Sequence, residues 1–142
     1  MERSLILVKP DAVTRGLSGA ILSRLEASGL KMIALKMLQI DEDLAVRHYA
    51  AHVEKPFFAG LIRYITSAPV VASVFLGDNA VARIRELMGP TDPAKASPGT
   101  LRRDFGVDIE HNAIHGSDSI ETADKEIRLF FNDQELMQYR RV

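Results

Sequence analysis

The chain opens with the stretch Ser4-Leu5-Ile6-Leu7-Val8-Lys9-Pro10, an apolar run that is stopped by a lysine and a proline. Such a run is typical of a buried strand. Proline disfavours the helical conformation in the residue before it, so we expect no helix at Lys9. Residues 70–76 have the same buried character, and residues 31–40 are compatible with a strand. A fourth strand is predicted at 126–131, where apolar side chains recur with a period of two.

Helical patterns lie between these strands and after the last one. Apolar residues spaced four apart predict a helix that starts near Leu17 and ends at Gly29, a typical C-terminal glycine. Aspartates suit the N-cap position, and a proline suits the first turn. The further predicted helices are 41–52 capped by Asp41, a helix from Pro56 to the residue before Pro69, 78–88 capped by Asp78, and 133–139 capped by Asp133.

Strands that alternate with helices predict an α/β chain of the α+β sandwich type. We expect a ferredoxin-like, four-stranded antiparallel sheet covered by helices, formed by one domain over residues 1–142. No glycine-rich phosphate fingerprint follows the first strand, which excludes a Rossmann or Walker site. Residues 89–125 are rich in proline and glycine but keep recurrent apolar residues, which indicates a long, folded functional loop before the last strand.

Composition excludes several classes of protein. The chain has 142 residues, of which 46% are hydrophobic, and this is enough to bury a core. It has no cysteine, so disulfides, thiolate nucleophiles and cysteine-ligated metals are excluded. No apolar run reaches the length of a membrane span, and the net charge of −1 argues against nucleic acid as the main partner. We expect a soluble, cytoplasmic protein.

The nearly balanced charge conceals an uneven distribution along the chain. Basic residues prevail in 81–103 and acidic residues prevail in 104–126. Arg85 borders the apolar stripe of its predicted helix, where a sheltered guanidinium could hold an anion or could extend from the edge of the core into solvent. Lys9 is either an ordinary strand-end lysine or a ligand contact. Phe57 lies off the core face of its helix and either stacks a base or packs on a neighbouring loop or subunit.

The four histidines form two pairs spaced four residues apart, His48 with His52 and His111 with His115. The accompanying residues of a helical metal motif are missing, so we expect no metal site built by the protein alone. His115 instead lies among small polar residues, and a neutral imidazole is a good nucleophile. Glu126, at the start of the predicted last strand, is a candidate to fix the tautomer of its ring.

Five segments, in order, resemble the nucleoside diphosphate kinase family, and the match spans essentially the whole chain. The most specific is Asn112-Ala113-Ile114-His115-Gly116-Ser117-Asp118-Ser119, which is similar to the active-site signature of that family. The other four are Ile6-Leu7-Val8-Lys9-Pro10-Asp11, Pro56-Phe57-Phe58-Ala59-Gly60-Leu61, Ser67-Ala68-Pro69-Val70-Val71 and Pro98-Gly99-Thr100-Leu101-Arg102. The resemblance implies a ferredoxin-like sandwich and a ping-pong transfer of the γ-phosphate of ATP, or another nucleoside triphosphate, to ribo- or deoxynucleoside diphosphates through a phosphohistidine.

The resemblance also implies residue roles. His115 would be the phosphorylated nucleophile, Glu126 and Tyr49 would position its ring, and Ser117 would support Glu126. Phe57 and Leu61 would pack the base, with Ile109 near its other face. The residues that match phosphate- and sugar-binding positions are Lys9, Arg85, Thr91, Arg102 and Asn112. Mg²⁺ would arrive on the nucleotide phosphates.

Members of the family are oligomers, and Pro93 in the long loop favours a hexamer over a tetramer. Arg103 and Pro90 depart from the common family pattern at the rim of the expected site. Two other functions compete with the kinase: a non-catalytic module of the same fold that senses nucleotides, and a nucleic-acid binder that stacks bases on Phe57. A sensor does not need to keep the nucleophile, and a nucleic-acid binder requires a broad basic face that the composition does not provide.

Overall fold

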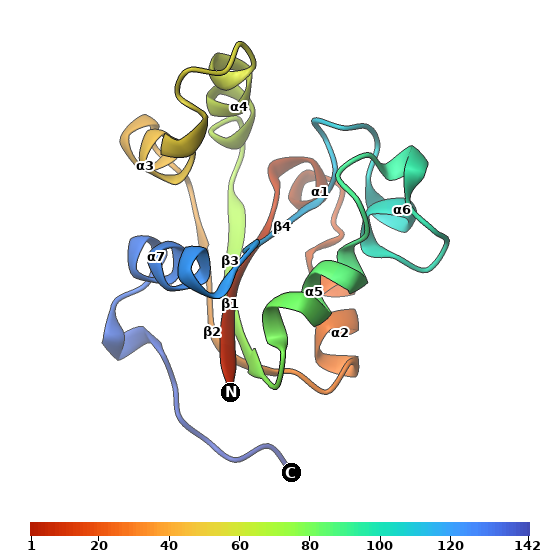
Figure 1. Cartoon of the computed structure of the whole chain (residues 1–142), viewed down its shortest axis with the longest axis vertical. Coiled ribbons are helices and arrows are strands. Elements are labelled where there is room, and N and C mark those ends of the chain that lie inside the picture. Colours follow the sequence, from red (N-terminus) through yellow and green to blue (C-terminus); the bar gives the residue numbers. More distant parts are fainter.

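A computed structural model describes residues 1–142 and contains one four-stranded sheet. Its strands are β1 (Glu2–Val8), β2 (Lys31–Leu38), β3 (Val70–Gly77) and β4 (Ile114–Gly116). They are ordered β2-β3-β1-β4, and each neighbouring pair is antiparallel (Figure 1). The antiparallel α+β sandwich expected from the sequence is confirmed.

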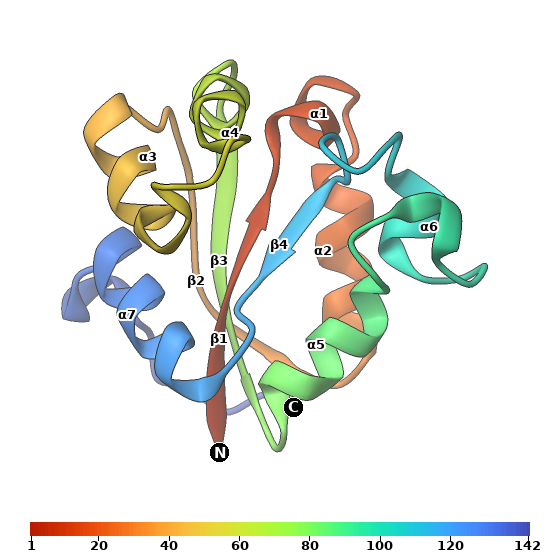
Figure 2. The ribbon, with the colours of Figure 1, turned by 45° about the horizontal axis from the view of Figure 1, so that its top comes forward.

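Helices cover both faces of this sheet, as Figure 2 shows: α3 and α7 lie on one face, and α2, α5 and α6 lie on the other. The helices are α1 (Pro10–Thr14), α2 (Ser18–Ala27), α3 (Glu42–His48), α4 (Phe58–Ile65), α5 (Ala80–Met88), α6 (Leu101–Phe105) and α7 (Ile120–Phe130). Short 3₁₀ turns occur at Ala50–His52, Pro93–Lys95 and Asp133–Glu135. None of the helices is long and apolar enough to cross a membrane.

The position of β1 explains its continuous apolar sequence. Leu5 and Leu7 pack into the core under α3 and α7, whereas Ile6 and Val8 pack into the core under α2 and α5. Successive side chains of a strand point to opposite faces, so a strand covered on both sides needs apolar residues at every position. The strand ends at Val8, so the next residue, Lys9, lies at one end of the sheet.

The prediction of a last strand at 126–131 is wrong, because these residues belong mostly to helix α7. Ser119 caps this helix by accepting a hydrogen bond from the Thr122 amide at 3.0 Å. Its buried residues Ala123, Ile127 and Phe130 follow the helical period. The fourth strand is β4, which lies inside the segment 89–125 that we expected to be a loop and which pairs with β1.

Helix boundaries also differ from those predicted. Asp41 caps α3 as expected, accepting from the Leu44 amide at 2.8 Å, but the predicted helix 41–52 breaks at Tyr49. Helix α4 begins after Pro56, at Phe58, and α5 begins after Asn79, not at a cap formed by Asp78.

The predicted helix 133–139 is reduced to the 3₁₀ turn Asp133–Glu135, which Asn132 caps. The Met137 amide donates to the Ile33 carbonyl at 2.8 Å, so tertiary pairing with β2 replaces helical hydrogen bonds in this segment.

Candidate active site

A cavity of about 600 Å³ lies at the end of the sheet where β1 ends and Lys9 follows it. It gathers side chains from distant parts of the chain, including α3, α4, α5, α6, β4 and α7. Of the residues predicted for the site, only Ser117 does not line it; the others, Lys9, Tyr49, Phe57, Leu61, Arg85, Thr91, Arg102, Ile109, Asn112, His115 and Glu126, all do.

His115 is the middle residue of β4 and lies opposite Leu7 of β1. Directly before the strand, Ala113 has φ +75°, and the Ile114 amide donates to the Asn112 carbonyl at 2.9 Å. This tight turn brings Asn112 and His115 to the same cavity. The following Gly116 has a packing role, because a Cβ there would lie 2.5 Å from Met88 Sδ. Glycine at this position therefore allows α5 to pack closely on β4.

Glu126 holds the His115 ring from the second half of α7. Both carboxylate oxygens of Glu126 lie 3.0 Å from His115 Nε2, and the Ser117 hydroxyl donates to Oε1 at 2.6 Å. Burial alone would raise the pKa of Glu126, but hydrogen bonds from His115 and Ser117 outweigh burial and hold this pKa below its usual value. An ionised carboxylate accepts only, so Nε2 carries the ring proton and Nδ1 keeps a lone pair. His115 is thus arranged with Nδ1 as its nucleophilic nitrogen.

Lys9 is buried at the polar end of the cavity. Its ammonium donates to Asn112 Oδ1 at 2.8 Å, and the Asn112 amide donates to the Thr91 carbonyl at 3.0 Å. Burial, together with the positive charge of Arg102, lowers the pKa of Lys9 to about 8. A cation in this position has little compensation within the protein, so it favours an anionic ligand.

Arg102 and Arg85 are fixed by backbone carbonyls beside the same space. Arg102 donates to Gly89 O at 3.1 Å and to Ile114 O at 2.9 Å, and Arg85 donates to Gly116 O at 3.2 Å. Burial, followed by the charge of Arg85, lowers the pKa of Arg102 to about 10, which leaves it cationic at neutral pH. Held in this way, the two guanidinium groups can bind phosphate oxygens without first being ordered.

The other end of the cavity is apolar and open. Phe57 and Ile109 are 50% and 55% exposed, although both are large apolar residues, and Leu61 lies between solvent and core. An exposed aromatic ring is a suitable platform for a flat heterocycle. Cations at one end and an aromatic ring at the other match the chemistry of a nucleotide.

Tyr49 lines the cavity, but no hydrogen bond joins its hydroxyl to His115 or Glu126. Its ring centroid lies 4.6 Å from that of His48, and burial, with the negative charge of Glu126, raises the pKa of Tyr49 to about 12. At the rim, Arg103 donates to Ala94 O at 3.2 Å and is absent from the cavity lining.

His48 is a site residue that the sequence reasoning missed. Its side chain is 1% exposed, Nδ1 lies 3.6 Å from Glu126 Oε2, and its ring meets that of His115 edge to face with centroids 4.8 Å apart. Burial, and then the neighbouring His115, lowers the pKa of His48 to about 3, so the ring is neutral. A signal was present: His48 follows Leu44 and Ala45 by four and three residues, which places it on the apolar stripe of α3.

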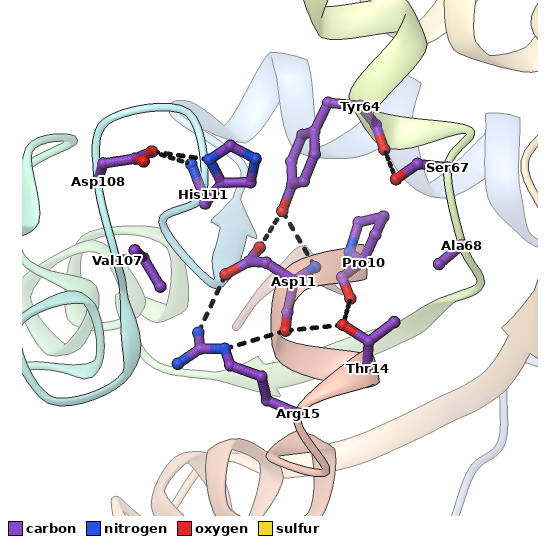
Figure 3. Close-up of a pocket in the computed structure, with 10 residues that line it drawn as sticks. All are labelled: Pro10, Asp11, Thr14, Arg15, Tyr64, Ser67, Ala68, Val107, Asp108 and His111. Atoms are coloured by element: carbon purple, nitrogen blue, oxygen red, sulfur yellow. Dashed lines mark hydrogen bonds and ion pairs between the residues drawn. The ribbon is translucent and has the colours of Figure 1, made fainter.

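A second, shallower pocket of about 540 Å³ opens on the far side of Tyr64 (Figure 3). Its central feature is the Asp11 carboxylate, 7% exposed, which accepts hydrogen bonds from the Tyr64 hydroxyl and from Arg15. The Asp11 amide also lies 3.3 Å from that hydroxyl. These contacts tie α4 to the start of α1, so this pocket helps to hold Lys9, two residues earlier, in place.

Comparison with known proteins assigns the family. Residues 2–136 match the family model described as nucleoside diphosphate kinase. A nucleoside diphosphate kinase of Dehalococcoides mccartyi strain 195 is 60% identical over 99% of both chains, and one of Archaeoglobus fulgidus is 52% identical over 99% of this chain and 93% of its own.

Solved structures agree with this result. The nucleoside diphosphate kinase of Aquifex aeolicus superposes with a TM-score of 0.94 at 44% identity, covering 96% of this chain and 99% of its own. The Halobacterium salinarum enzyme, solved in complex with CDP, gives a TM-score of 0.96 at 52% identity, covering 99% of this chain and 93% of its own. The chain therefore belongs to the nucleoside diphosphate kinase family.

Proposed function

We propose that this protein is a nucleoside diphosphate kinase, which transfers the γ-phosphate of a nucleoside triphosphate, typically ATP, to a ribo- or deoxynucleoside diphosphate. The observation that carries this proposal is the His115 ring, fixed through Nε2 by Glu126 at 3.0 Å, in a cavity that buried cations line. A module that only senses nucleotides has no need of an oriented nucleophile, so this geometry favours the enzyme.

The first half-reaction is attack by Nδ1 of His115 on the γ-phosphorus. The bond from that phosphorus to the β–γ bridging oxygen breaks, the nucleoside diphosphate leaves, and the phosphoryl group stays on Nδ1. The ring becomes cationic because Nε2 retains its proton, and the Glu126 carboxylate at 3.0 Å stabilises that charge. The second half-reaction reverses these steps with a different diphosphate, which gives ping-pong kinetics.

Lys9, Arg85 and Arg102 neutralise the phosphate oxygens and align the γ-phosphorus with Nδ1 in this proposal, and Thr91 and Asn112 help to bind the phosphates and the sugar. These roles are supported by the hydrogen-bond donors of these residues, which line one end of the cavity. Phe57, Leu61 and Ile109 hold the base by its π-face, which leaves the base edges unread and admits several bases. Nucleotide binding by the CDP-bound relative supports this arrangement.

Mg²⁺ fits the site as a companion of the substrate. The phosphate end of the cavity is lined by cations, and Glu126, a carboxylate close to His115, is already bound to His115 and Ser117. A hard ion of this kind prefers oxygen ligands and keeps several waters, so the nucleotide phosphates and water would hold it, with few ligands from the protein. When bound with the nucleotide, the ion would neutralise charge on the phosphate oxygens.

We also propose a homo-oligomer, with the hexamer preferred. Strand β2 is an edge strand of the sheet, and its residues Leu35 and Met37 are exposed although apolar, as is typical of a surface that another chain covers. The preference for a hexamer rests on Pro93 and on the family resemblance. Because its substrates are free nucleotides, we expect the enzyme to work in the cytoplasm, with neither membrane nor nucleic acid as its main partner.

Incubation with γ-labelled ATP and Mg²⁺ tests the function. We expect one phosphate per chain, labile in acid and stable in base, and discharged by any nucleoside diphosphate. His115→Ala should abolish labelling, whereas the matched control His111→Ala, which removes an exposed histidine, should leave it intact. Stable nucleotide binding without any phosphoenzyme would identify a sensor and reject the kinase.

A further inference from the structure

His48 has an energetic cost that the transfer mechanism does not explain. Both of its ring nitrogens are buried and neither has a hydrogen-bond partner. An unsatisfied polar atom in the interior costs about 1–3 kcal/mol, so each one calls for an explanation. Another buried aromatic or aliphatic side chain would fill the same space beside His115 without this cost.

The nitrogens of His48 face the groups that hold the nucleophile. Three elements bring these groups together: His48 ends α3, His115 lies in β4 and Glu126 lies in α7. One nitrogen from each histidine and one oxygen from Glu126 all lie within 4.8 Å of one another. His48, from the pair His48/His52, therefore meets His115, from the pair His111/His115. The spacing of histidines in the sequence does not indicate this combination.

We propose that His48, His115 and Glu126 form a binding site for a borderline transition-metal ion such as Zn²⁺, distinct from the Mg²⁺ carried by the nucleotide. Two imidazole nitrogens and one carboxylate oxygen are a typical ligand set for an open zinc site with a fourth position for water. Mg²⁺ prefers an all-oxygen shell and does not compete well for imidazole.

The separations fit such an ion after a modest adjustment. Ligands of tetrahedral zinc, at 2.0–2.2 Å from the metal, lie about 3.4 Å apart. Glu126 Oε2 is 3.6 Å from His48 Nδ1 and 3.0 Å from His115 Nε2, which is close to that spacing. The nitrogens of the two imidazoles lie within 4.8 Å of each other, so they need to approach by up to about 1.4 Å, which side-chain rotations supply.

The surroundings suit a metal site in two further respects. Ser117 already donates to Glu126 Oε1 and keeps the carboxylate oriented, so Oε2 can exchange its 3.0 Å contact with His115 Nε2 for a bond to the ion. All three ligand residues line the main cavity, which gives an ion a route from solvent.

Occupancy of this site would switch off the nucleophile, an inference that rests on the proposed function. A metal on Nε2 of His115 takes the lone pair of that nitrogen, so the proton of the neutral ring must move to Nδ1. Nδ1 then has no lone pair to form a bond with phosphorus. The inhibition would leave Lys9, Arg102 and the base-binding end of the cavity unchanged, so nucleotides would still bind.

Titration with Co²⁺ alone, as a visible probe for Zn²⁺, tests the site directly. We expect one equivalent to bind in the micromolar range or tighter, with the intense visible bands of four- or five-coordinate cobalt, and Zn²⁺ to displace it. In the wild-type protein, bound Co²⁺ should broaden the NMR signals of the His48 and His115 rings and spare His111. The absence of saturable binding at millimolar Co²⁺, or broadening centred on another histidine, would overturn the proposal.

Variants then assign the ligands. His48→Gln and Glu126→Gln should each weaken Co²⁺ binding by more than the roughly 10–100-fold seen for partners outside the ligand shell. The matched control His111→Ala removes an exposed histidine that also lies beside a carboxylate, at 2.9 Å from Asp108, and should bind Co²⁺ like the wild type. Unchanged affinity in a folded His48→Gln protein would refute the assignment, and the wild-type NMR result decides the question if that variant does not fold.

The inhibitory consequence needs a separate measurement. Protein loaded with one equivalent of Zn²⁺ and freed of excess metal should form phosphoenzyme from MgATP at least tenfold more slowly than metal-free protein, and a chelator should restore the rate. In His48→Gln the ratio of the two rates should be near one. If metal-free protein forms no phosphoenzyme, the proposed function fails while the Co²⁺ titration still decides the metal site. Equal rates with bound Zn²⁺ would refute the tautomer argument.

Discussion

Replacing Glu126 with glutamine tests how the His115 ring is held. The carboxylate is buried, lies 3.0 Å from Nε2 through both oxygens, and receives a 2.6 Å hydrogen bond from Ser117. Glutamine keeps the size of the side chain and removes the charge. Its carbonyl can still accept from Nε2, but its amide can also turn toward Nε2 and donate, which forces the ring proton onto Nδ1.

The size of the effect follows from the hydrogen bond that is lost. A hydrogen bond to a charged group contributes about 1.5–3 kcal/mol, and about 1.36 kcal/mol corresponds to a tenfold change in rate. Loss of the negative charge beside a ring that becomes cationic should therefore slow phosphoenzyme formation by about 10–150-fold. The wrong tautomer adds to this loss. ATP affinity should change little, because Glu126 touches the ring and not the phosphates.

Rapid-quench measurement of phosphoenzyme formation from γ-labelled ATP separates these effects. Ser117→Ala is the matched control, because it removes one donor to Glu126 and keeps the charge; we expect a loss of roughly tenfold or less. Thermal unfolding verifies that both variants are folded. A Glu126→Gln rate within about twofold of wild type, or a loss confined to ATP affinity, would refute the account of ring orientation.

Tyr64→Phe removes the hydroxyl bound to buried Asp11 and should lower the free energy of unfolding by about 1–3 kcal/mol, with a melting temperature several degrees lower; an unchanged melting curve would contradict this. Since the pKa of Lys9 is lowered from 10.5 to about 8, ATP affinity measured by calorimetry should fall as the pH rises above 8, more steeply than in Lys9→Arg. Between pH 8 and 10.5 the unfolded chain keeps the Lys9 proton that the folded chain has lost, so the contribution of Lys9 to the free energy of unfolding rises over this range. Arg102→Ala should lower kcat much more than Phe57→Ala, which should mainly raise KM, and equal losses of kcat would argue against these roles.

The strands that are covered on both sides could be predicted from sequence because nearly every residue in them is apolar. The run Ser4–Val8 and residues 70–76 both form central strands. Helix α7 was misassigned because Ile127, Leu129 and Phe131 alternate like a strand, while the helical stripe also uses Ala123 and Glu126, which a hydrophobic pattern does not register. Strand β4 is too short, at three residues, to produce a pattern of its own.

The site was easier to predict than the elements that carry it. The expected neighbour of His115 is Glu126, although it reaches the ring from a helix and not from a strand. His48 was missed because its significance depends on tertiary contacts: α3 and α7 have to pack together before its nitrogens face Glu126. The contact between Asp11 and Tyr64 joins residues 53 positions apart, and no local pattern predicts it.

The central claim is that Nδ1 of His115 carries the phosphoryl group, because Glu126 occupies Nε2. The most direct measurement is NMR of the phosphoenzyme, with ³¹P and ring ¹⁵N signals of histidine-labelled protein formed from MgATP in alkaline buffer. We expect a single phosphohistidine at His115 with the P–N bond at Nδ1 and a proton retained on Nε2. Phosphorus bonded to Nε2, or to any residue other than His115, would contradict it.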